Sequence, residues 1–371
     1  MQKNMSKRFI QSMGFIISSF LLLTACGEPV TTESSATSKE PAKTFQWKMV
    51  TSWPKNFPGL GLAPEKFSQY VNEMSDGRLT VKVYGAGELV PGLAVFDTVA
   101  AGTVEMGHSG AYYWKGKMPA SPIFGAIPFG MTATEFNSWL HFGGGLALWQ
   151  ELYKPFGLIP LAGGNTGAQF GGWFKKEINT VDDLTGLKMR IPGLAGDVLK
   201  RAGGVPVTLA GGEIFPALQS GALDASEWVG PYNDLAFGFY QTAPYYYSTV
   251  WHEPGASLEF IINEKAFNGL PKDLQKIVTI AARAVNDDTL AEYDARNYKA
   301  LQTLVTEHKV QLRTLPKAVI TQLKKYTDEV ISEQVAADET FANIWKSYSE
   351  YMLAMREYND LTLKAYFDNR K

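Results

Sequence analysis

Residues 44–52 read TFQWKMVTS, residues 79–84 read LTVKVY and residues 104–109 read VEMGHS. The first segment alternates polar and apolar side chains, which is the period of a β-strand, and the other two are also predicted strands. Helical patterns separate them, because apolar residues recur at helical spacing over 61–75 and again over 94–101. This alternation of strand and helix predicts an α/β lobe with a largely parallel sheet.

A second set of strands and helices follows from residue 158 onward. The expected strands are residues 158–162, 172–174, 188–191, 206–208 and 225–228, and the expected helices are residues 193–202 and 213–220. Residues 258–263 then form a strand pattern that is predicted to return to the first lobe. A chain that crosses between two lobes and returns indicates a hinge, with the cleft between the lobes as the natural ligand site.

The C-terminal third is predominantly helical. Residues 272–308 give an almost unbroken helical pattern, and residues 317–369 continue it with Tyr, Trp, Met and Leu at spacings of three and four. Such stripes usually pack against other elements of the same chain. Helices of this length can also reach across both lobes or contact a dimer partner.

The mature chain is therefore expected to form two lobes. We assign residues 46–167 and 254–290 to lobe 1, and residues 168–253 and 291–371, with the long C-terminal helices, to lobe 2. The apolar fraction of 45% is ordinary for a globular protein. A net charge of −2 without a basic stripe argues against a nucleic-acid partner, because phosphates need clustered positive charge.

The N-terminus has the pattern of an export signal. Lys3, Lys7 and Arg8 give it a positive start, and an apolar run follows over residues 9–23. That run is shorter than the roughly 20 apolar residues of a comfortable transmembrane helix. Residues 1–25 are therefore predicted to be a signal peptide.

The sequence LTACG at residues 23–27 resembles the lipobox of bacterial lipoproteins, in which cleavage leaves a cysteine for lipid attachment. Cys26, the single cysteine of the chain, would then begin the mature protein and anchor it to a membrane of the cell envelope. The alternative is a free cysteine in an uncleaved N-terminal anchor. Residues 26–44 are mostly Thr, Ser, Pro, Glu and Lys, a composition that predicts a flexible tether.

The sequence contains none of the catalytic motifs that we considered for metal-dependent or nucleophilic enzymes. The four histidines form no metal-binding or nucleophile–base motif, and Ser226 does not lie in a Gly-x-Ser-x-Gly turn. A carboxylate-based hydrolase that uses Glu227 and Glu253 is an alternative that stays open, because the separation of two carboxylates cannot be derived from sequence.

Several motifs between residues 165 and 255 resemble the binding lobe of the DctP-type solute receptors of TRAP transporters. They are NTGAQ at 165–169, GGWF at 171–174, LTGLKMRIPG at 184–193, GGEIFPALQSG at 211–221 and LDASEWVGP at 223–231. The resemblance covers essentially the whole mature chain. It is closest to the subgroup that binds 2-oxo or 2-hydroxy monocarboxylates together with a metal ion, through Glu227-Trp228 and the HEPG sequence at 252–255.

The resemblance implies a two-lobe fold of the periplasmic-binding-protein type and a function in transport without chemistry. The receptor would capture a small 2-oxo or 2-hydroxy monocarboxylate such as pyruvate, together with a cation, and deliver it to the membrane subunits of a TRAP permease. A sensory receptor for the same class of ligand is the alternative. The subgroup also includes homodimers.

Arg190 is the candidate for binding the ligand's carboxylate. It lies at the end of a predicted strand just before Pro192 and Gly193, so its side chain can emerge at a strand-to-helix turn beside the cleft. A guanidinium pairs with a carboxylate through two parallel hydrogen bonds, which fixes orientation as well as charge. The receptor family uses an arginine at this position for the same purpose. The alternative is a surface arginine near a helix N-terminus.

Four residues are candidate metal ligands: Gln169, Glu227, Trp228 through its main-chain carbonyl, and Glu253. Oxygen donors without clustered His or Cys suit a hard cation such as sodium or calcium rather than zinc or copper. The cation would offset the charge of two carboxylates and an anionic ligand. The alternative is that Glu227 only forms an ion pair with Arg190 and that Glu253 is a surface loop residue.

Further ligand contacts are expected from aromatic and amide side chains. Tyr113 follows a predicted strand end, where cleft residues of α/β sheets usually lie, and its phenol can donate a hydrogen bond. Asn165, Gln169 and Trp228 are further candidate ligand contacts. Weaker candidates are Phe129, Trp173 and Tyr232.

Overall fold

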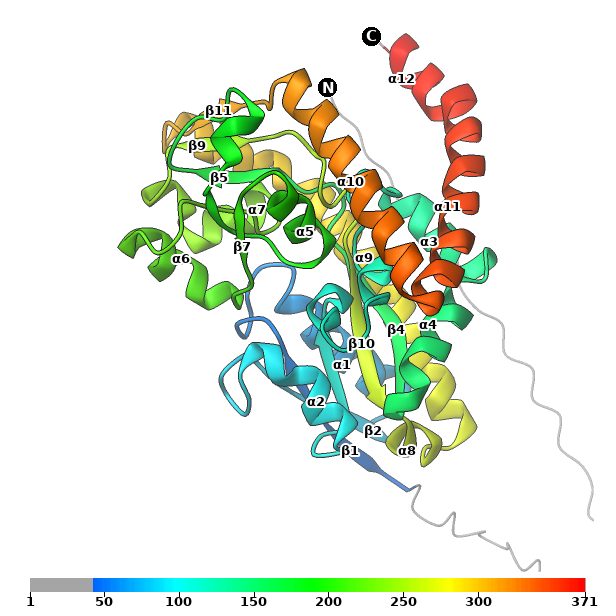
Figure 1. Ribbon diagram of the computed structural model, residues 1–371. Helices are drawn as coiled ribbons and strands as arrows, with labels where there is room; N and C mark the ends of the chain where they lie inside the picture. The colour runs from blue at the N-terminus through cyan, green and yellow to red at the C-terminus, as the bar shows by residue number, and fades with distance from the viewer. Residues whose placement is uncertain (1–42, 371) are drawn as a thin grey trace, which may run out of the picture. The chain divides into compact units, whose positions relative to one another are not determined.

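The computed structural model describes residues 43–370. Its first sheet has five strands in the order β2-β1-β3-β10-β4 (Figure 1). The strands are β1 (Phe45–Thr51), β2 (Leu79–Tyr84), β3 (Met106–Ser109), β4 (Leu158–Asn165) and β10 (Ser257–Asn263). Strands β2, β1 and β3 are parallel, whereas β10 runs antiparallel to both of its neighbours, β3 and β4.

The second sheet has six strands in the order β11-β9-β5-β8-β6-β7. These are β5 (Gly172–Phe174), β6 (Lys188–Arg190), β7 (Val205–Val207), β8 (Ala225–Ser226), β9 (Tyr245–Tyr247) and β11 (Gln311–Arg313). Strand β5 is antiparallel to both β8 and β9, and the other pairings are parallel. The α/β fold is confirmed, but both sheets are mixed rather than largely parallel.

Helices surround the two sheets (Figure 1). They are α1 (Leu62–Met74), α2 (Val95–Ala100), α3 (Ala133–Phe142), α4 (Gly145–Tyr153), α5 (Gly193–Arg201), α6 (Gly211–Ser220), α7 (Pro231–Phe237), α8 (Glu264–Asn268), α9 (Lys272–Thr306), α10 (Lys317–Ala337), α11 (Glu339–Asn359) and α12 (Ala365–Asn369). Helices α3 and α4 were not expected. Helix α3 begins with a capping box in which Glu135 Oε2 accepts from the main-chain N–H of Thr132 over 2.8 Å.

We call the elements around the first sheet the first half of the molecule and those around the second sheet the second half. The long C-terminal helices connect these two halves. Helix α9 contacts α1 and β4 of the first half and α7 of the second, while α10 packs on α5 and α11 on α3 and α4. Every strand of the first sheet falls within 45–165 or 257–263. The expected boundary at residue 290 lies inside α9, so the lobe limits stay a prediction.

One apolar cluster contains residues from both sheets. Trp53 and Leu258 come from the first half, and Trp173, Trp228 and Tyr246 come from the second. All five side chains are buried, so removing them from water stabilises the contact between the halves.

The predicted signal peptide and Cys26 lie outside the described residues, as does most of the predicted tether. Between residues 43 and 370, no helix has the length and apolar character needed to cross a membrane.

Candidate functional site

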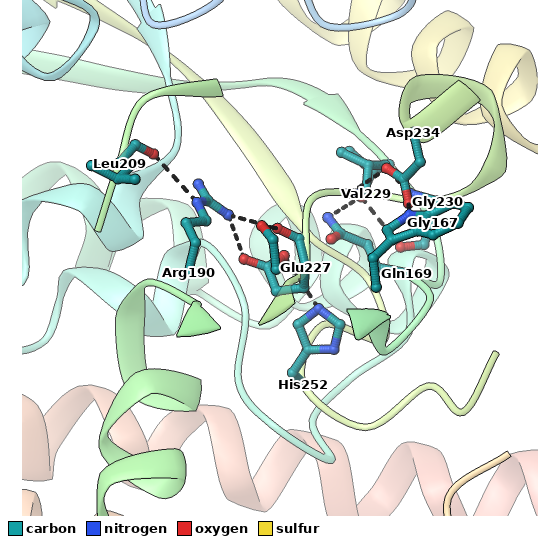
Figure 2. Close-up of polar contacts among 12 residues, drawn as sticks. Gly167, Gln169, Arg190, Leu209, Glu227, Val229, Gly230, Asp234 and His252 are labelled. Atoms are coloured by element: carbon teal, nitrogen blue, oxygen red, sulfur yellow. Dashed lines mark hydrogen bonds and ion pairs between the residues drawn. The ribbon is translucent and has the colours of Figure 1, made fainter. Parts of the chain in front are cut away.

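Arg190 ends strand β6 and is almost fully buried. Strand β6 pairs with β8 so that Arg190 lies opposite Ser226, which brings the next residue, Glu227, to the guanidinium. Nη1 forms an ion pair with Glu227 Oε1, and Nε donates to the Leu209 carbonyl over 3.3 Å (Figure 2). Nη2 donates to the Tyr113 hydroxyl over 2.8 Å. The guanidinium carbon lies 4.8 Å from the centre of the Trp228 ring.

Arg190 remains positively charged in this setting. Burial opposes the charged form, but the surrounding Tyr113, Glu227, Tyr112 and Glu253 outweigh it and raise the pKa of Arg190. A guanidinium has five N–H groups. Nε donates to Leu209 and one N–H of Nη2 donates to Tyr113. Nη1 donates to the carboxylate of Glu227 and lies 3.4 Å from the main-chain carbonyl of the same residue. Within the described residues, the second N–H of Nη2 is left for a ligand.

His252 lies on the other side of Glu227. Its Nε2 is 3.4 Å from Glu227 Oε2, and both residues are buried (Figure 2). Neither ring nitrogen of His252 has a hydrogen-bond partner among the described residues. Both oxygens of Glu227 therefore face nitrogen atoms, one of Arg190 and one of His252.

Glu253 is a buried carboxyl group rather than a surface loop residue, because only 5% of it is exposed. Burial, and next the charge of Glu227, raise the pKa of Glu253 well above its usual range, and Arg190 opposes this shift. Two carboxyl groups that repel each other in a buried site favour either a proton or a cation. The Arg190–Glu227 ion pair of the alternative interpretation is present, but its surface position for Glu253 is wrong.

The side-chain oxygen of Gln169 is unpaired among the described residues. Its Nε2 donates to Thr166 Oγ1 over 2.9 Å, whereas its Oε1 is buried and has no hydrogen-bond partner in the described part of the chain. Its main-chain N–H donates to the Glu253 carbonyl over 3.0 Å. This bond joins the loop that follows β4 to the loop that precedes β10. Because buried polar atoms are normally paired, this oxygen is free to accept from a ligand or to bind a cation.

Asn165 ties the same two loops together. It ends β4, its Oδ1 accepts from Gly167 N–H over 2.9 Å, and its Nδ2 donates to the Gly255 carbonyl over 3.4 Å. Its amide oxygen and nitrogen are therefore both engaged with main chain. Here the side chain supports the positions of Gln169 and Glu253.

Tyr113 reaches the site from the other half of the molecule. It belongs to the 3₁₀ turn η2 (Ala111–Trp114) that follows β3, and its hydroxyl accepts the hydrogen bond from Arg190. Trp228 lies against Arg190 from the second sheet, and its Nε1 has no hydrogen-bond partner among residues 43–370.

The three weaker candidates have partners elsewhere. Phe129 packs against Trp251, Trp173 Nε1 donates to Asp234 over 3.0 Å, and the Tyr232 hydroxyl donates to Glu292 over 3.0 Å. Between residues 43 and 370, no hydrogen bond or cation–π contact joins these three side chains to Arg190.

Sequence reasoning gave no role to several residues at or near the site. His252 was quoted only as part of a motif, and its place beside Glu253 was the one local signal. Lys115 Nζ pairs with Asp197 Oδ1 over 2.6 Å, and Trp53 Nε1 donates to His108 Nδ1 over 2.8 Å. The two partners of each pair are far apart in sequence, so no local pattern could reveal them.

The donor atoms of the candidate metal ligands are all oxygens, which suit a hard cation. No cluster of three or more His, Cys, Asp or Glu side chains able to hold a metal ion occurs in the described chain. The expected set needs none, because it combines two carboxylates with an amide oxygen and a main-chain carbonyl. The unpaired Oε1 of Gln169 and the mutual repulsion of Glu227 and Glu253 both fit a hard cation.

Comparison with known proteins gives a consistent result. Residues 49–338 match the family model DctP, bacterial extracellular solute-binding protein, family 7. A monocarboxylate 2-oxoacid-binding periplasmic protein of Nostoc sp. is 40% identical over 365 residues, which cover 98% of this chain and 99% of the relative.

Two solved structures add information on ligands. A TRAP periplasmic solute-binding protein from Pseudoalteromonas atlantica, with bound sodium and pyruvate, is 43% identical and superposes with a TM-score of 0.87 over 89% of this chain and 100% of that one. A TRAP transporter solute-binding protein from Bordetella bronchiseptica, a mixed-occupancy dimer with calcium and picolinate in one site, is 36% identical with a TM-score of 0.86, over 88% and 97% of the two chains.

Proposed function

The chain belongs to the DctP family of bacterial extracellular solute-binding proteins, family 7, and we propose that it captures a small 2-oxo or 2-hydroxy monocarboxylate, such as pyruvate, together with a sodium or calcium ion. The observation that carries this proposal is the buried, positively charged Arg190 with an N–H left for a ligand, in one group with two buried carboxyl groups and the unpaired oxygen of Gln169.

Arg190 is proposed to bind the carboxylate of the ligand. A buried positive charge attracts an anion more strongly than an exposed one, because little water screens it. The hydroxyl of Tyr113 and the amide of Gln169 are the further polar groups proposed for the ligand, and Asn165 supports them through its bonds to Gly167 and Gly255. The ring of Trp228 forms an apolar face beside the guanidinium.

Charge balance supports a cation in the same site. Glu227, Glu253 and a ligand carboxylate carry three negative charges when ionised, and Arg190 carries one positive charge. Gln169 Oε1, the carboxylates of Glu227 and Glu253, and the Trp228 carbonyl are the residues proposed to hold the ion. The ion would neutralise the excess negative charge and bind oxygen atoms of the ligand.

Capture is proposed to involve closure of two lobes, with no chemical change to the ligand. Contacts that link the two halves are Tyr113 with Arg190 and Lys115 with Asp197. A ligand that touches both halves favours the closed arrangement by its differential affinity. The closed receptor would then dock on the membrane subunits of a TRAP permease. A sensory role for the same ligand is the alternative.

Cys26 is proposed to be lipidated and to hold the receptor at a membrane. The support is the positive start, the short apolar run and the LTACG sequence at 23–27. Metabolic labelling with a radioactive fatty acid tests this proposal. We expect label in the wild type and none in Cys26→Ala, and labelled Cys26→Ala would contradict it.

A homodimer is proposed through the C-terminal helices. Leu361, Leu363, Tyr366 and Phe367, at and beyond the end of α11, are each about half exposed or more, which is unusual for four large apolar side chains so close together. The Bordetella bronchiseptica relative is a dimer. Light scattering after size exclusion should give twice the monomer mass, and a variant with all four residues changed to Ser should give the monomer mass. A monomeric wild type would exclude the dimer.

Calorimetric titration of the purified mature protein tests the main proposal. We expect pyruvate to bind in the presence of sodium or calcium and to bind weakly after chelation and desalting. Arg190→Ala should abolish binding, whereas Arg296→Ala, an exposed arginine on α9, should leave it unchanged. Wild-type affinity in Arg190→Ala would refute the carboxylate assignment, and conversion of the ligand into a product would indicate an enzyme. Loss of uptake in a deletion strain separates transport from sensing.

A further inference from the structure

Trp53 joins the two halves at the candidate site. It follows β1 of the first sheet and is 1% exposed. Its ring lies 6.2 Å from that of Tyr113 and 6.0 Å, edge to face, from that of Trp228. These are two of the side chains that contact Arg190, one from each half of the molecule.

His108 fixes the indole of Trp53 through a hydrogen bond to its N–H. Trp53 Nε1 donates to His108 Nδ1 over 2.8 Å, and His108 Nε2 lies 2.9 Å from the Gly163 carbonyl. An indole N–H can only donate and a carbonyl can only accept, so His108 must be neutral with its proton on Nε2. Burial lowers the pKa of His108 to about 4, which agrees with this single neutral form.

The surrounding main chain is fixed as well. The Thr51 hydroxyl donates to the Trp53 carbonyl over 2.9 Å, and Ser52 Oγ lies 2.6 Å from Ser109 Oγ across the β1–β3 pair. His108 is fully buried and packs against Phe260 at a ring distance of 4.6 Å. The indole therefore cannot rotate without leaving buried polar atoms unpaired, which is costly.

We infer that Trp53 is the wall that limits the length of the ligand's carbon chain, and that His108 is the positioning residue that keeps this wall in place. The inference rests on the proposed function, because it concerns the end of the ligand opposite the carboxylate bound by Arg190. Trp228 lies over the guanidinium and Tyr113 is hydrogen-bonded to it, and the indole of Trp53 packs beside both of these rings. A rigid aromatic wall at this place favours a short chain and excludes a branched or longer one.

The test compares pyruvate with 4-methyl-2-oxopentanoate by calorimetry, in the full mature protein with calcium present. The measured quantity is the ratio of the two dissociation constants. We expect Trp53→Ala to shift this ratio by about tenfold or more in favour of the longer acid, which is the change that one or two methylenes produce in an apolar pocket. Trp345→Ala, on α11, is the matched control and should keep the wild-type ratio.

Variants of His108 separate positioning from general stability. His108→Gln can still accept from the indole and donate to the Gly163 carbonyl, so it should keep the wild-type ratio. His108→Leu removes both hydrogen bonds and should shift the ratio in the same direction as Trp53→Ala. Trp53→Phe keeps an aromatic ring without the N–H and should give a ratio between those of the wild type and Trp53→Ala. This variant tests the role of Trp53 even if the other variants fail to fold.

The outcomes distinguish this inference from the proposed function. Wild-type protein that binds neither acid would refute the proposed function itself. Wild-type protein that binds pyruvate, combined with Trp53 variants that weaken both acids by the same factor, would overturn the inference and leave the function intact.

Discussion

Glu259→Gln should remove a large part of the pH dependence of stability between pH 5 and pH 8. Glu259 lies on β10 and is fully buried, and its two oxygens accept hydrogen bonds from Trp114 Nε1 and from the Tyr153 hydroxyl, the latter at 2.8 Å. Burial raises the pKa of Glu259 to about 7, against the weaker opposing effect of the two donors. The unfolded chain has the ordinary value of 4.5.

The sign follows from the number of bound protons. Between pH 4.5 and 7 the folded protein holds a proton on Glu259 that the unfolded chain has lost, so stability falls as pH rises. The contribution is fully present below pH 4.5 and is lost above pH 7. From pH 5 to pH 8 the loss is about 2 to 3 kcal/mol for this one group, at 1.36 kcal/mol per pKa unit.

Denaturant unfolding of the wild type and of Glu259→Gln at pH 5, 6, 7 and 8 measures this contribution as a difference. The glutamine resembles the protonated acid, because its oxygen can accept from Trp114 while its nitrogen donates to Tyr153. We expect the variant to lose about 2 to 3 kcal/mol less than the wild type over this range. Glu264→Gln, an exposed residue on α8, should show no such difference. Parallel pH profiles for wild type and Glu259→Gln would refute the reasoning.

Three further predictions concern closure, the cation and the C-terminal helices. Lys115→Ala removes a partly exposed ion pair with Asp197 and should weaken pyruvate binding up to about fivefold, mainly through faster dissociation in stopped-flow measurements. Glu253→Gln removes a proposed metal ligand and should reduce the effect of calcium on pyruvate affinity. Asp338→Ala removes the side chain that caps α11 at Phe341 N–H over 2.6 Å, and should lower the unfolding free energy by about 1 kcal/mol.

Each of these predictions has an outcome that contradicts it. Unchanged dissociation in Lys115→Ala would mean that the ion pair does not stabilise the closed form. Lys117→Ala, two residues further along the chain, is the control, because Lys117 pairs with Asp97 instead. Calcium dependence identical to the wild type in Glu253→Gln would exclude Glu253 from the metal site. An unfolding free energy equal to the wild type in Asp338→Ala would show that the cap contributes nothing to stability.

Sequence patterns predicted those parts of the fold in which local periodicity is strong. Residues 79–84 alternate apolar and polar side chains and form β2 as expected, and the helical pattern from residue 272 forms α9. Strands β9 and β11 were missed, because β11 is held by pairing with β9 and β9 by pairing with β5, and pairing between distant segments leaves no pattern in the local sequence. The family motifs predicted that Arg190 and Glu227 belong to one site, whereas spacing alone could not.

The direction of β10 explains why Gln169 and Glu253 meet, and no local pattern predicts that direction. Strand β10 runs antiparallel to β4, with Ser257 paired to Asn165, so the start of β10 lies beside the end of β4. The loop that follows β4 carries Gln169, and the loop that precedes β10 carries Glu253. Had β10 been parallel to β4, its first residue would lie at the opposite end of the pair, roughly 20 Å away at 3.3 Å per residue. The main-chain bond from Gln169 to Glu253 could not form, and the amide oxygen would lie far from the second carboxylate. The mixed character of this sheet therefore brings together the oxygen atoms that the proposed cation requires.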